Sequence, residues 1–442
     1  MKYPIVPALL LSCVGAIVPA AGAATQPAVV AEPAGPRSSD EISVEDLVRR
    51  AATLIADNYV FPDTGRQTAV MLSMNLGRGE YNGLDAQQLA QALSRDLREF
   101  TEDGHFGAQW QPPRPADAEI EMIPQRPSGT YGFEKIERLD GNIGYLDLRG
   151  FHRAAQAAET LHAAMRLLQG SDALIFDMRR NGGGDPETVR LLCSYLFDPT
   201  ETVHLNSLYF RPADRTTEFW TTAELESEAM PDTPVFVLTS GYTFSGAEEF
   251  TYNLQTRGRA TIVGETTGGG AHPVDGFDLG DGIVLRIPVG RAINPITKTN
   301  WEGTGVSPDV ACPADDALDV AMELALEAVL DANPDSASAA WALDAMRARS
   351  NPFTLSDDQL DEYAGEYGDR EIRLENGRLE YRRIGANANW RPLIAVGADA
   401  FMIEGVQDFR MEFERADENA GGSIVGIRGV YRDGPSDYSE RD

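Results

Sequence analysis

Short apolar runs alternate with amphipathic stretches between residues 141 and 311, and this alternation restricts the fold more than any other feature. Apolar runs typical of buried strands cover residues 143–148, 173–177, 235–239 and 260–263. Helical patterns cover residues 154–168 and 246–256 between them, and residues 317–330 after the last run. Strands and helices in turn predict an α/β sheet with both faces covered. Because open α/β sheets bind ligands at the carboxyl ends of their strands, the turns after these runs are candidate sites.

The regions on either side of this core have different patterns. Leu47, Ala51 and Ile55 recur at helical spacing, with Ser43 as an N-cap, and predict a helical domain over residues 41–110. The core then spans residues 111–332, followed by a linker over 333–356 with one helical turn or more near 339–347. Alternating residues around Asn376-Gly377 predict a hairpin, so residues 357–442 read as a small all-β domain.

The first residues read as an export signal. Lys2 precedes an apolar run over residues 5–18, and Ala21-Gly22-Ala23 provides small residues for cleavage. We therefore expect a signal peptide over residues 1–23, a flexible tether over 24–40 and a periplasmic or extracellular protein. Lipid anchoring at Cys13 is not expected, because the apolar run continues past it. No other segment is predicted to enter a membrane.

Composition excludes several classes of partner. The 442 residues include 69 acidic and 38 basic ones, so the net charge is 38 − 69 = −31. Such a field repels nucleic acid and anionic membrane surfaces. No pattern of metal ligands or cofactor motif is found, so we expect neither. After export the remaining cysteines are Cys193 and Cys312, which we expect to be two separate buried thiols. The oligomeric state is left open.

Two of the predicted turns fit the chemistry of acyl transfer. Residues 177–184 end in Gly182-Gly183-Gly184, whose backbone N–H groups suit an oxyanion beside a helix N-terminus. A phosphate loop would need a Lys-Ser or Lys-Thr pair, which is missing. Residues 239–249 place Ser245 between a buried strand and a helix, where it is either a nucleophile or an N-cap. Ser240 is the weaker candidate.

A serine nucleophile needs a base. The five histidines are His105, His152, His162, His204 and His272. His105 stands in a polar turn, and His272 follows a glycine run over residues 268–270; the pattern alone leaves both open. A third turn, over residues 301–309, contains Glu302, which is either the acid that orients the base or a solvated carboxylate.

These turns occur in the order that resembles the C-terminal processing (tail-specific) serine peptidase superfamily, over about residues 40–330. The resemblance implies an α/β, crotonase-like catalytic core that hydrolyses peptide bonds. It also implies that Ser245 is the nucleophile and that the N–H groups of Gly183 and Gly246 form the oxyanion hole.

The superfamily has two catalytic styles. One uses a lysine in the glycine turn, at a position that matches Gly270, whereas the mature chain has only Lys135 and Lys298. The other, in tricorn protease and relatives of interphotoreceptor retinoid-binding protein, uses Ser, His and Glu. Asp103-Gly104-His105 matches the histidine turn of that branch, and Glu302 falls in its acid turn. The resemblance therefore favours His105 over His272.

Many members carry a PDZ module, for which residues 107–140 are too few. The predicted function is a secreted or periplasmic serine endopeptidase that acts on peptides or proteins. The alternatives are a non-catalytic module for an apolar, retinoid- or lipid-type ligand, and an esterase with the same triad.

Overall fold

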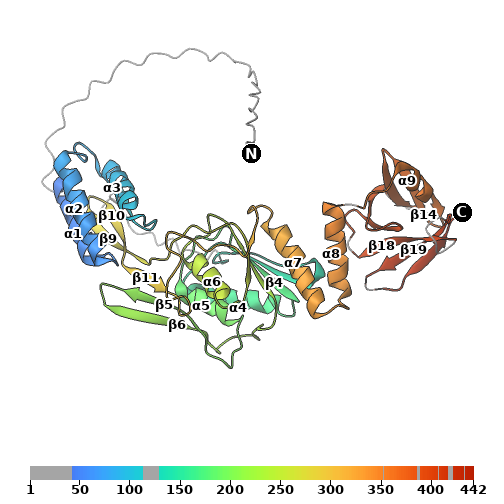
Figure 1. The fold of residues 1–442 in the computed structure, drawn as a ribbon, viewed down its shortest axis with the longest axis horizontal. Coiled ribbons are helices and arrows are strands. Elements are labelled where there is room, and N and C mark those ends of the chain that lie inside the picture. Colours follow the sequence, from blue (N-terminus) through green and yellow to red (C-terminus); the bar gives the residue numbers. More distant parts are fainter. Residues whose placement is uncertain are drawn as a thin grey trace, which may run out of the picture. The chain divides into compact units, whose positions relative to one another are not determined.

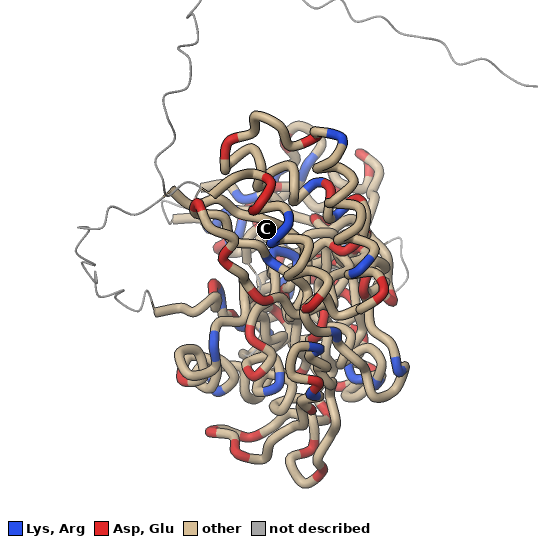
Figure 2. The backbone as a smooth tube through the Cα atoms, turned by 90° about the vertical axis from the view of Figure 1, so that its left-hand side faces the viewer, with Lys and Arg blue, Asp and Glu red and all other residues tan. Residues whose placement is uncertain are grey.

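The computed structural model describes residues 42–112, 129–351, 353–385, 389–406, 408–416, 422–432 and 434–442. The predicted signal peptide, the tether and Cys13 lie outside these ranges. Within them, no helix has the length and apolar character needed to cross a membrane. Figure 2 shows Lys and Arg positions interspersed with the more numerous Asp and Glu positions along the backbone.

A six-stranded sheet forms the centre of the core, as the alternation of elements predicts (Figure 1). Its order is β12-β8-β7-β4-β3-β2; every neighbouring pair is parallel except β2 with β3, which is antiparallel. The carboxyl ends of β4, β7 and β8 therefore lie next to one another at one edge. The strands are β2 (Phe133–Leu139), β3 (Ile143–Leu148), β4 (Ala173–Asp177), β7 (Val235–Thr239), β8 (Thr261–Gly264) and β12 (Val310–Ala311).

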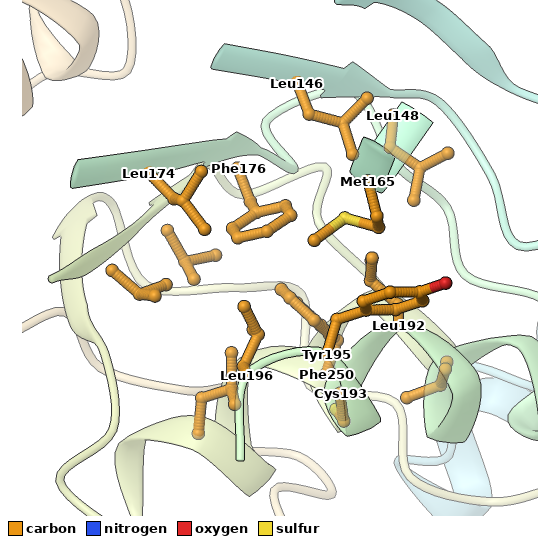
Figure 3. Packing of buried hydrophobic residues seen from close by; sticks show 14 of the residues in the cluster. Leu146, Leu148, Met165, Leu174, Phe176, Leu192, Cys193, Tyr195, Leu196 and Phe250 are labelled. Carbon is orange, nitrogen blue, oxygen red and sulfur yellow. The ribbon is translucent and has the colours of Figure 1, made fainter. Parts of the chain in front are cut away.

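Both faces of this sheet are covered, because successive side chains of a strand point to opposite faces. Leu174 and Phe176 of β4 pack in the cluster formed with α4 (Ala154–Leu168), α5 (Pro186–Ser194) and α6 (Gly246–Gln255), part of which Figure 3 shows. Ala173 and Ile175 pack instead with α7 (Ala317–Ala332). The sheet is thus the middle layer of three. Helix α6 packs on the same face as α4 and α5.

The N-terminal region is helical, as predicted. It contains α1 (Val44–Asn58), α2 (Pro62–Arg78) and α3 (Ala86–Thr101). The Ser43 hydroxyl accepts from the Asp46 N–H at 3.1 Å, so the predicted N-cap is confirmed. These helices share a core with a small sheet, β1 (Gly107–Trp110), β10 (Ile283–Pro288) and β9 (Val274–Gly280). Residues distant in the sequence therefore complete the helical region.

A second three-stranded sheet joins the helical region to the core. Its strands are β11 (Gly290–Ile293), β5 (His204–Phe210) and β6 (Arg215–Trp220), in the order β11-β5-β6. The Arg211 guanidinium in the turn between β5 and β6 donates to the Tyr59 carbonyl at 2.6 Å and to the Ala56 carbonyl at 3.0 Å. These bonds cap the carboxyl end of α1.

Beyond α7 the chain is more regular than the predicted linker. Helix α8 (Ala337–Ser350), where one helical turn or more was expected, buries Ala339 and Leu343 against α7, because small residues let the two helices approach closely. After α9 (Asp357–Tyr363), eight strands form one antiparallel sheet in chain order, and a bridge between Tyr367 and Arg441 nearly closes it. The remaining elements are η1 (Asp140–Asn142) and strands β13 (Gly365–Tyr367), β14 (Arg370–Glu375), β15 (Arg378–Arg383), β16 (Arg391–Ala395), β17 (Ala400–Ile403), β18 (Phe409–Arg415), β19 (Ile424–Tyr431) and β20 (Asp437–Glu440).

Two smaller expectations are also tested. The hairpin around Asn376-Gly377 is confirmed, with both residues at positive φ, 52° and 75°. Both thiols in the described chain are free, but only Cys193 is buried. Cys312 is half-buried, which corrects the expectation of two buried thiols; it directly follows the short edge strand β12, where less of the chain covers it.

We expect Arg211→Ala to lower the free energy of unfolding by about 1–3 kcal/mol, because two helix-end carbonyls lose charged donors. Denaturant unfolding of the whole protein measures this. Arg215→Ala, at an exposed position on β6, is the matched control. Equal effects from both substitutions would contradict the capping role.

Candidate active site

The turn after β7 presents Ser245 in a strained conformation. Ser245 has φ 51° and ψ −119°, which a residue with a side chain rarely adopts. Two hydrogen bonds join this turn to the neighbouring turn after β4. The Ser240 hydroxyl donates to the Arg179 carbonyl at 2.6 Å, and the Thr243 hydroxyl donates to the Met178 carbonyl at 2.8 Å. Ser240 therefore has a structural partner, and Ser245 stands at the point where β7 leads into α6.

The glycine turn after β4 lies directly against Ser245. A Cβ placed on Gly183 would come within 2.8 Å of the Ser245 Cβ and 2.5 Å of the Gly246 nitrogen. Only glycine permits this approach, and Gly183 also has φ 97°. The Gly183 N–H donates to the buried Asn181 side chain at 2.8 Å. The backbone groups predicted for an oxyanion hole are thus close to Ser245, with that of Gly183 held by an amide oxygen.

Glu248 joins the turn that carries Ser245 to the glycine-rich turn after β8. Its buried carboxylate accepts from the backbone N–H groups of Ser245 at 2.8 Å, Gly269 at 2.7 Å and Gly270 at 2.8 Å. The Thr267 hydroxyl donates to the same carboxylate at 2.5 Å. Burial raises the pKa of Glu248, although these four donors act in the opposite direction. The turns after β7 and β8 are therefore fixed relative to each other.

His105 lies between this assembly and the helical region. Its ring packs on the Phe244 ring, with centroids 4.7 Å apart. A Cβ placed on Gly270 would lie 2.6 Å from the His105 Cε1 and 2.5 Å from the Phe244 Cε2. His105 thus occupies the volume that a side chain at position 270 would need, and Gly270 lines the same cavity as Ser245.

The Nδ1 atom of His105 lies near two acids. Its Nδ1 is 3.6 Å from Asp103 Oδ1 and 4.0 Å from Glu302 Oε2. Within the described part of the chain, neither ring nitrogen has a hydrogen-bond partner, although the residue is only 8% exposed. The Ser245–His105 hydrogen bond of an assembled triad is therefore not formed in this conformation. Catalytic hydrogen bonds are often long before substrate binds.

His272 lies near the same two acids but lines a different cavity from Ser245. Its Nδ1 is 2.7 Å from Asp103 Oδ2 and 3.4 Å from Glu302 Oε2, and its ring packs edge-on against Phe61. It lines a cavity of about 270 Å³ that Ser245 does not line. Of the two histidines the sequence left open, His105 is the one in contact with the residue preceding Ser245.

Burial and hydrogen bonding shift the pKa values of Asp103 and Glu302 in opposite directions. Burial raises the pKa of Asp103, but hydrogen bonds from the backbone N–H of His105 and from the ring of His272 outweigh it and hold the pKa well below its usual range. Burial and the negative charge of Asp103 raise the pKa of Glu302 to about 7, although the Ala271 N–H donates to it at 2.5 Å. Glu302 therefore ionises near neutral pH.

One ligand atom from each of Asp103, His272 and Glu302 lies within 4.8 Å of the others, so a metal ion could bridge them. The bond between Asp103 and His272 satisfies these two groups without one.

The remaining histidines have structural partners. His162 Nδ1 is 2.5 Å from the Tyr195 hydroxyl, and the His204 ring stacks on Trp220. The His152 ring meets Tyr131 edge-on.

Comparison with known families gives two matches. The model of peptidase family S41 matches residues 142–312, and that of the N-terminal domain of Peptidase S41 in eukaryotic IRBP matches residues 41–135. The chain belongs to peptidase family S41. The S41 match covers the turns with Ser245 and Glu302, and the second match covers the turn with His105. No PDZ module is found among the residues that the structure describes.

Relatives of this S41 chain include processing proteases. A carboxyl-terminal-processing protease of Synechocystis is 29% identical over 46% of this chain and 48% of its own length. The chloroplastic carboxyl-terminal-processing peptidase 1 of Arabidopsis thaliana is 26% identical over 41% and 35%. The chain thus spans less than half of these relatives. A crystal structure of a putative peptidase from Parabacteroides merdae has 21% identity and a TM-score of 0.47, covering 64% of this chain and 95% of that one.

Two residues of the site were missed by sequence reasoning. Asp103 was noted only as part of the histidine turn, yet it binds the ring of His272, 169 positions away. Glu248 was included only within the range 239–249 around Ser245. The position three residues after a candidate N-cap serine was an available signal, because a carboxylate there reaches back to the cap N–H.

We expect Gly270→Ala to lower the free energy of unfolding by about 1–3 kcal/mol, because its methyl group would overlap the rings of His105 and Phe244. The matched control is Gly241→Ala, since a Cβ on Gly241 meets nothing within 4 Å. Histidine NMR signals should shift for His105 in the first variant only. Two equally stable variants would contradict the packing described here.

Proposed function

We propose that this S41 chain is an exported serine endopeptidase in which Ser245 is the nucleophile, His105 the general base and Glu302 the acid that orients it. The observation that carries the proposal is the position of His105. Its ring fills the space beside the Ser245 turn that a lysine at position 270 would enter, and its Nδ1 edge faces Glu302. A histidine base is therefore sterically compatible with this site, and a lysine there is not.

The mechanism follows the serine–histidine–acid template. His105 Nε2 removes the proton of Ser245 Oγ as this oxygen attacks the peptide carbonyl. The positive charge formed on the imidazole is stabilised by Asp103 and Glu302, which lie 3.6 and 4.0 Å from Nδ1. The imidazolium then protonates the leaving amine, and a water molecule attacks the acyl-enzyme in the same way. Substrate binding would have to bring Nε2 and Oγ into hydrogen-bond contact.

The oxyanion would lie between the turn after β4 and the start of α6. The Gly246 N–H is the first proposed donor. The Gly183 N–H, the second, would have to leave Asn181 Oδ1 to reach the oxyanion. Removal of one such donor typically lowers the rate about 10²–10³-fold.

The proposed substrate is an exposed peptide segment of a protein. Recognition of free C-terminal tails is not part of the proposal, although the relatives are named for carboxyl-terminal processing. Export rests on the sequence of residues 1–23.

A serine-directed fluorophosphonate tests the nucleophile. We expect covalent labelling of the wild-type protein and none of Ser245→Ala, because the probe needs an activated serine. Ser240→Ala is the matched control in the same turn and should still be labelled. Failure of the wild-type protein to react would favour the non-catalytic binding module. Labelling together with hydrolysis of esters but not of peptides would favour the esterase.

The choice of base is tested by peptide hydrolysis. We expect His105→Ala to lower kcat by about 10³-fold or more, because no other group can accept the serine proton. His272→Ala should lower it far less, since His272 faces the other cavity. The reverse order of effects would contradict the assignment.

The ionisation of Glu302 should make kcat/KM depend on pH. Ionised Glu302 is the active form, so kcat/KM should fall as the pH drops through about 7. Asp103→Asn removes a negative charge that raises the pKa of Glu302, and it should move the acid limb to lower pH. Rates measured from pH 5 to 9 test this, with unfolding curves to exclude loss of fold. An unmoved limb would contradict the electrostatic coupling.

A further inference from the structure

A cavity of about 170 Å³ opens beside Ser245 and is mainly apolar. It lies between the start of α6, the turn after β8 and the sheet formed by β5 and β11. Its lining side chains are mostly aliphatic or aromatic and include Leu208, Phe210, Pro273, Ala292 and Trp301. Its position next to the proposed nucleophile and Gly246 is where the side chain on the acyl side of the cut bond would enter.

One acid interrupts this apolar lining. Glu249 lines the cavity, and its backbone N–H donates to the Ser245 carbonyl at 2.9 Å, one helical turn away. The residue is only 6% exposed. No salt bridge to Glu249 is formed within the described chain, and no Lys, Arg or His is among the residues that line the cavity. A buried carboxyl without a cation is unusual unless a ligand supplies one.

The surroundings of Glu249 are also negative. Asp185 and Glu187, at the start of α5, both act on it as like charges, and the Asn206 side chain is its polar neighbour. Arg257, which follows α6, donates to the His204 carbonyl, and within the described chain it forms no ion pair with Glu249. Glu187 forms a salt bridge with Arg190 at 2.7 Å, but within the described chain neither Glu249 nor Asp185 forms one, so the charge beside the cavity favours a positive group.

We propose that this cavity receives the substrate residue whose carbonyl Ser245 attacks, the P1 residue, and that Glu249 selects a cationic side chain there. This inference rests on the proposed function and specifies its substrate class. The apolar walls suit the methylene stem of arginine or lysine, and the carboxylate at the helix suits its charged end. A purely aliphatic P1 residue would leave Glu249 buried without a partner.

The ionisation of Glu249 supplies a way to test this. Burial raises its pKa to about 8, so in the empty cavity it is largely neutral at pH 6.5 and ionised at pH 9. Arginine keeps its charge throughout this range. Selection for arginine should therefore strengthen as the pH rises.

The experiment compares two peptides that differ only in arginine or citrulline at P1, because citrulline has the same shape without the charge. We expect the arginine-to-citrulline ratio of kcat/KM to reach about 30-fold or more at pH 9 and to be much smaller at pH 6.5. The ratio cancels the pH dependence of the catalytic groups. It should approach one in Glu249→Gln and stay high in Glu201→Gln, a control at an exposed acid that does not line the cavity.

Equal cleavage of both peptides by the wild-type protein at pH 9 would overturn the inference and leave the proposed function standing. Retention of the ratio in Glu249→Gln would overturn it too. Binding of the two product peptides to Ser245→Ala, measured by fluorescence anisotropy, separates the two hypotheses. Tighter binding of the arginine product without any turnover by the wild-type protein would support the cationic pocket and contradict the peptidase.

Discussion

The arrangement of the site depends on the carboxylate of Glu248. It accepts hydrogen bonds from Ser245, Gly269 and Gly270 and from the Thr267 hydroxyl, and so joins the turns that follow two neighbouring strands. Parallel strands bring these turns to one edge of the sheet, but they do not fix the turns relative to each other. Burying a carboxylate costs free energy unless hydrogen-bond donors surround it. Here three of the four donors are backbone N–H groups of the two turns, so the same bonds hold these turns in place. The strained φ of Ser245 is retained by this contact.

Position 270 links the geometry to the choice of base. Because Gly270 has no side chain, the rings of His105 and Phe244 can lie against its backbone. A lysine would have to displace both rings, so a histidine from the helical region and a lysine from this turn exclude each other sterically. The helical region then has a direct part in the proposed chemistry, since α3 ends at the turn that carries Asp103 and His105. Its attachment through Arg211 places this turn against the core.

The sequence predicts most of the fold, for identifiable reasons. Strands β4 and β7 are buried on both faces and read as continuous apolar runs, so their bounds match the prediction. The turns with Ser245 and Gly183 follow from those strands. The pairing of Asp103 with His272 could not be predicted, because contacts between residues far apart in sequence leave no local pattern. Helix α8 was underestimated, since its alanine-rich face is weakly amphipathic and its burial depends on α7.

The acids of the site differ in ionisation although they share one region of the protein. The charge of −31 is common to all of them, so it does not distinguish one from another. The backbone N–H of His105 and the ring of His272 donate to Asp103, and the pKa of this acid is low. One backbone N–H reaches Glu302 and only a neighbouring amide reaches Glu249, and burial raises the pKa of each. The hydrogen-bond donors that reach each carboxylate therefore decide its ionisation. Asp103 is already charged, whereas the charge of Glu249 would be stabilised by the proposed cationic substrate.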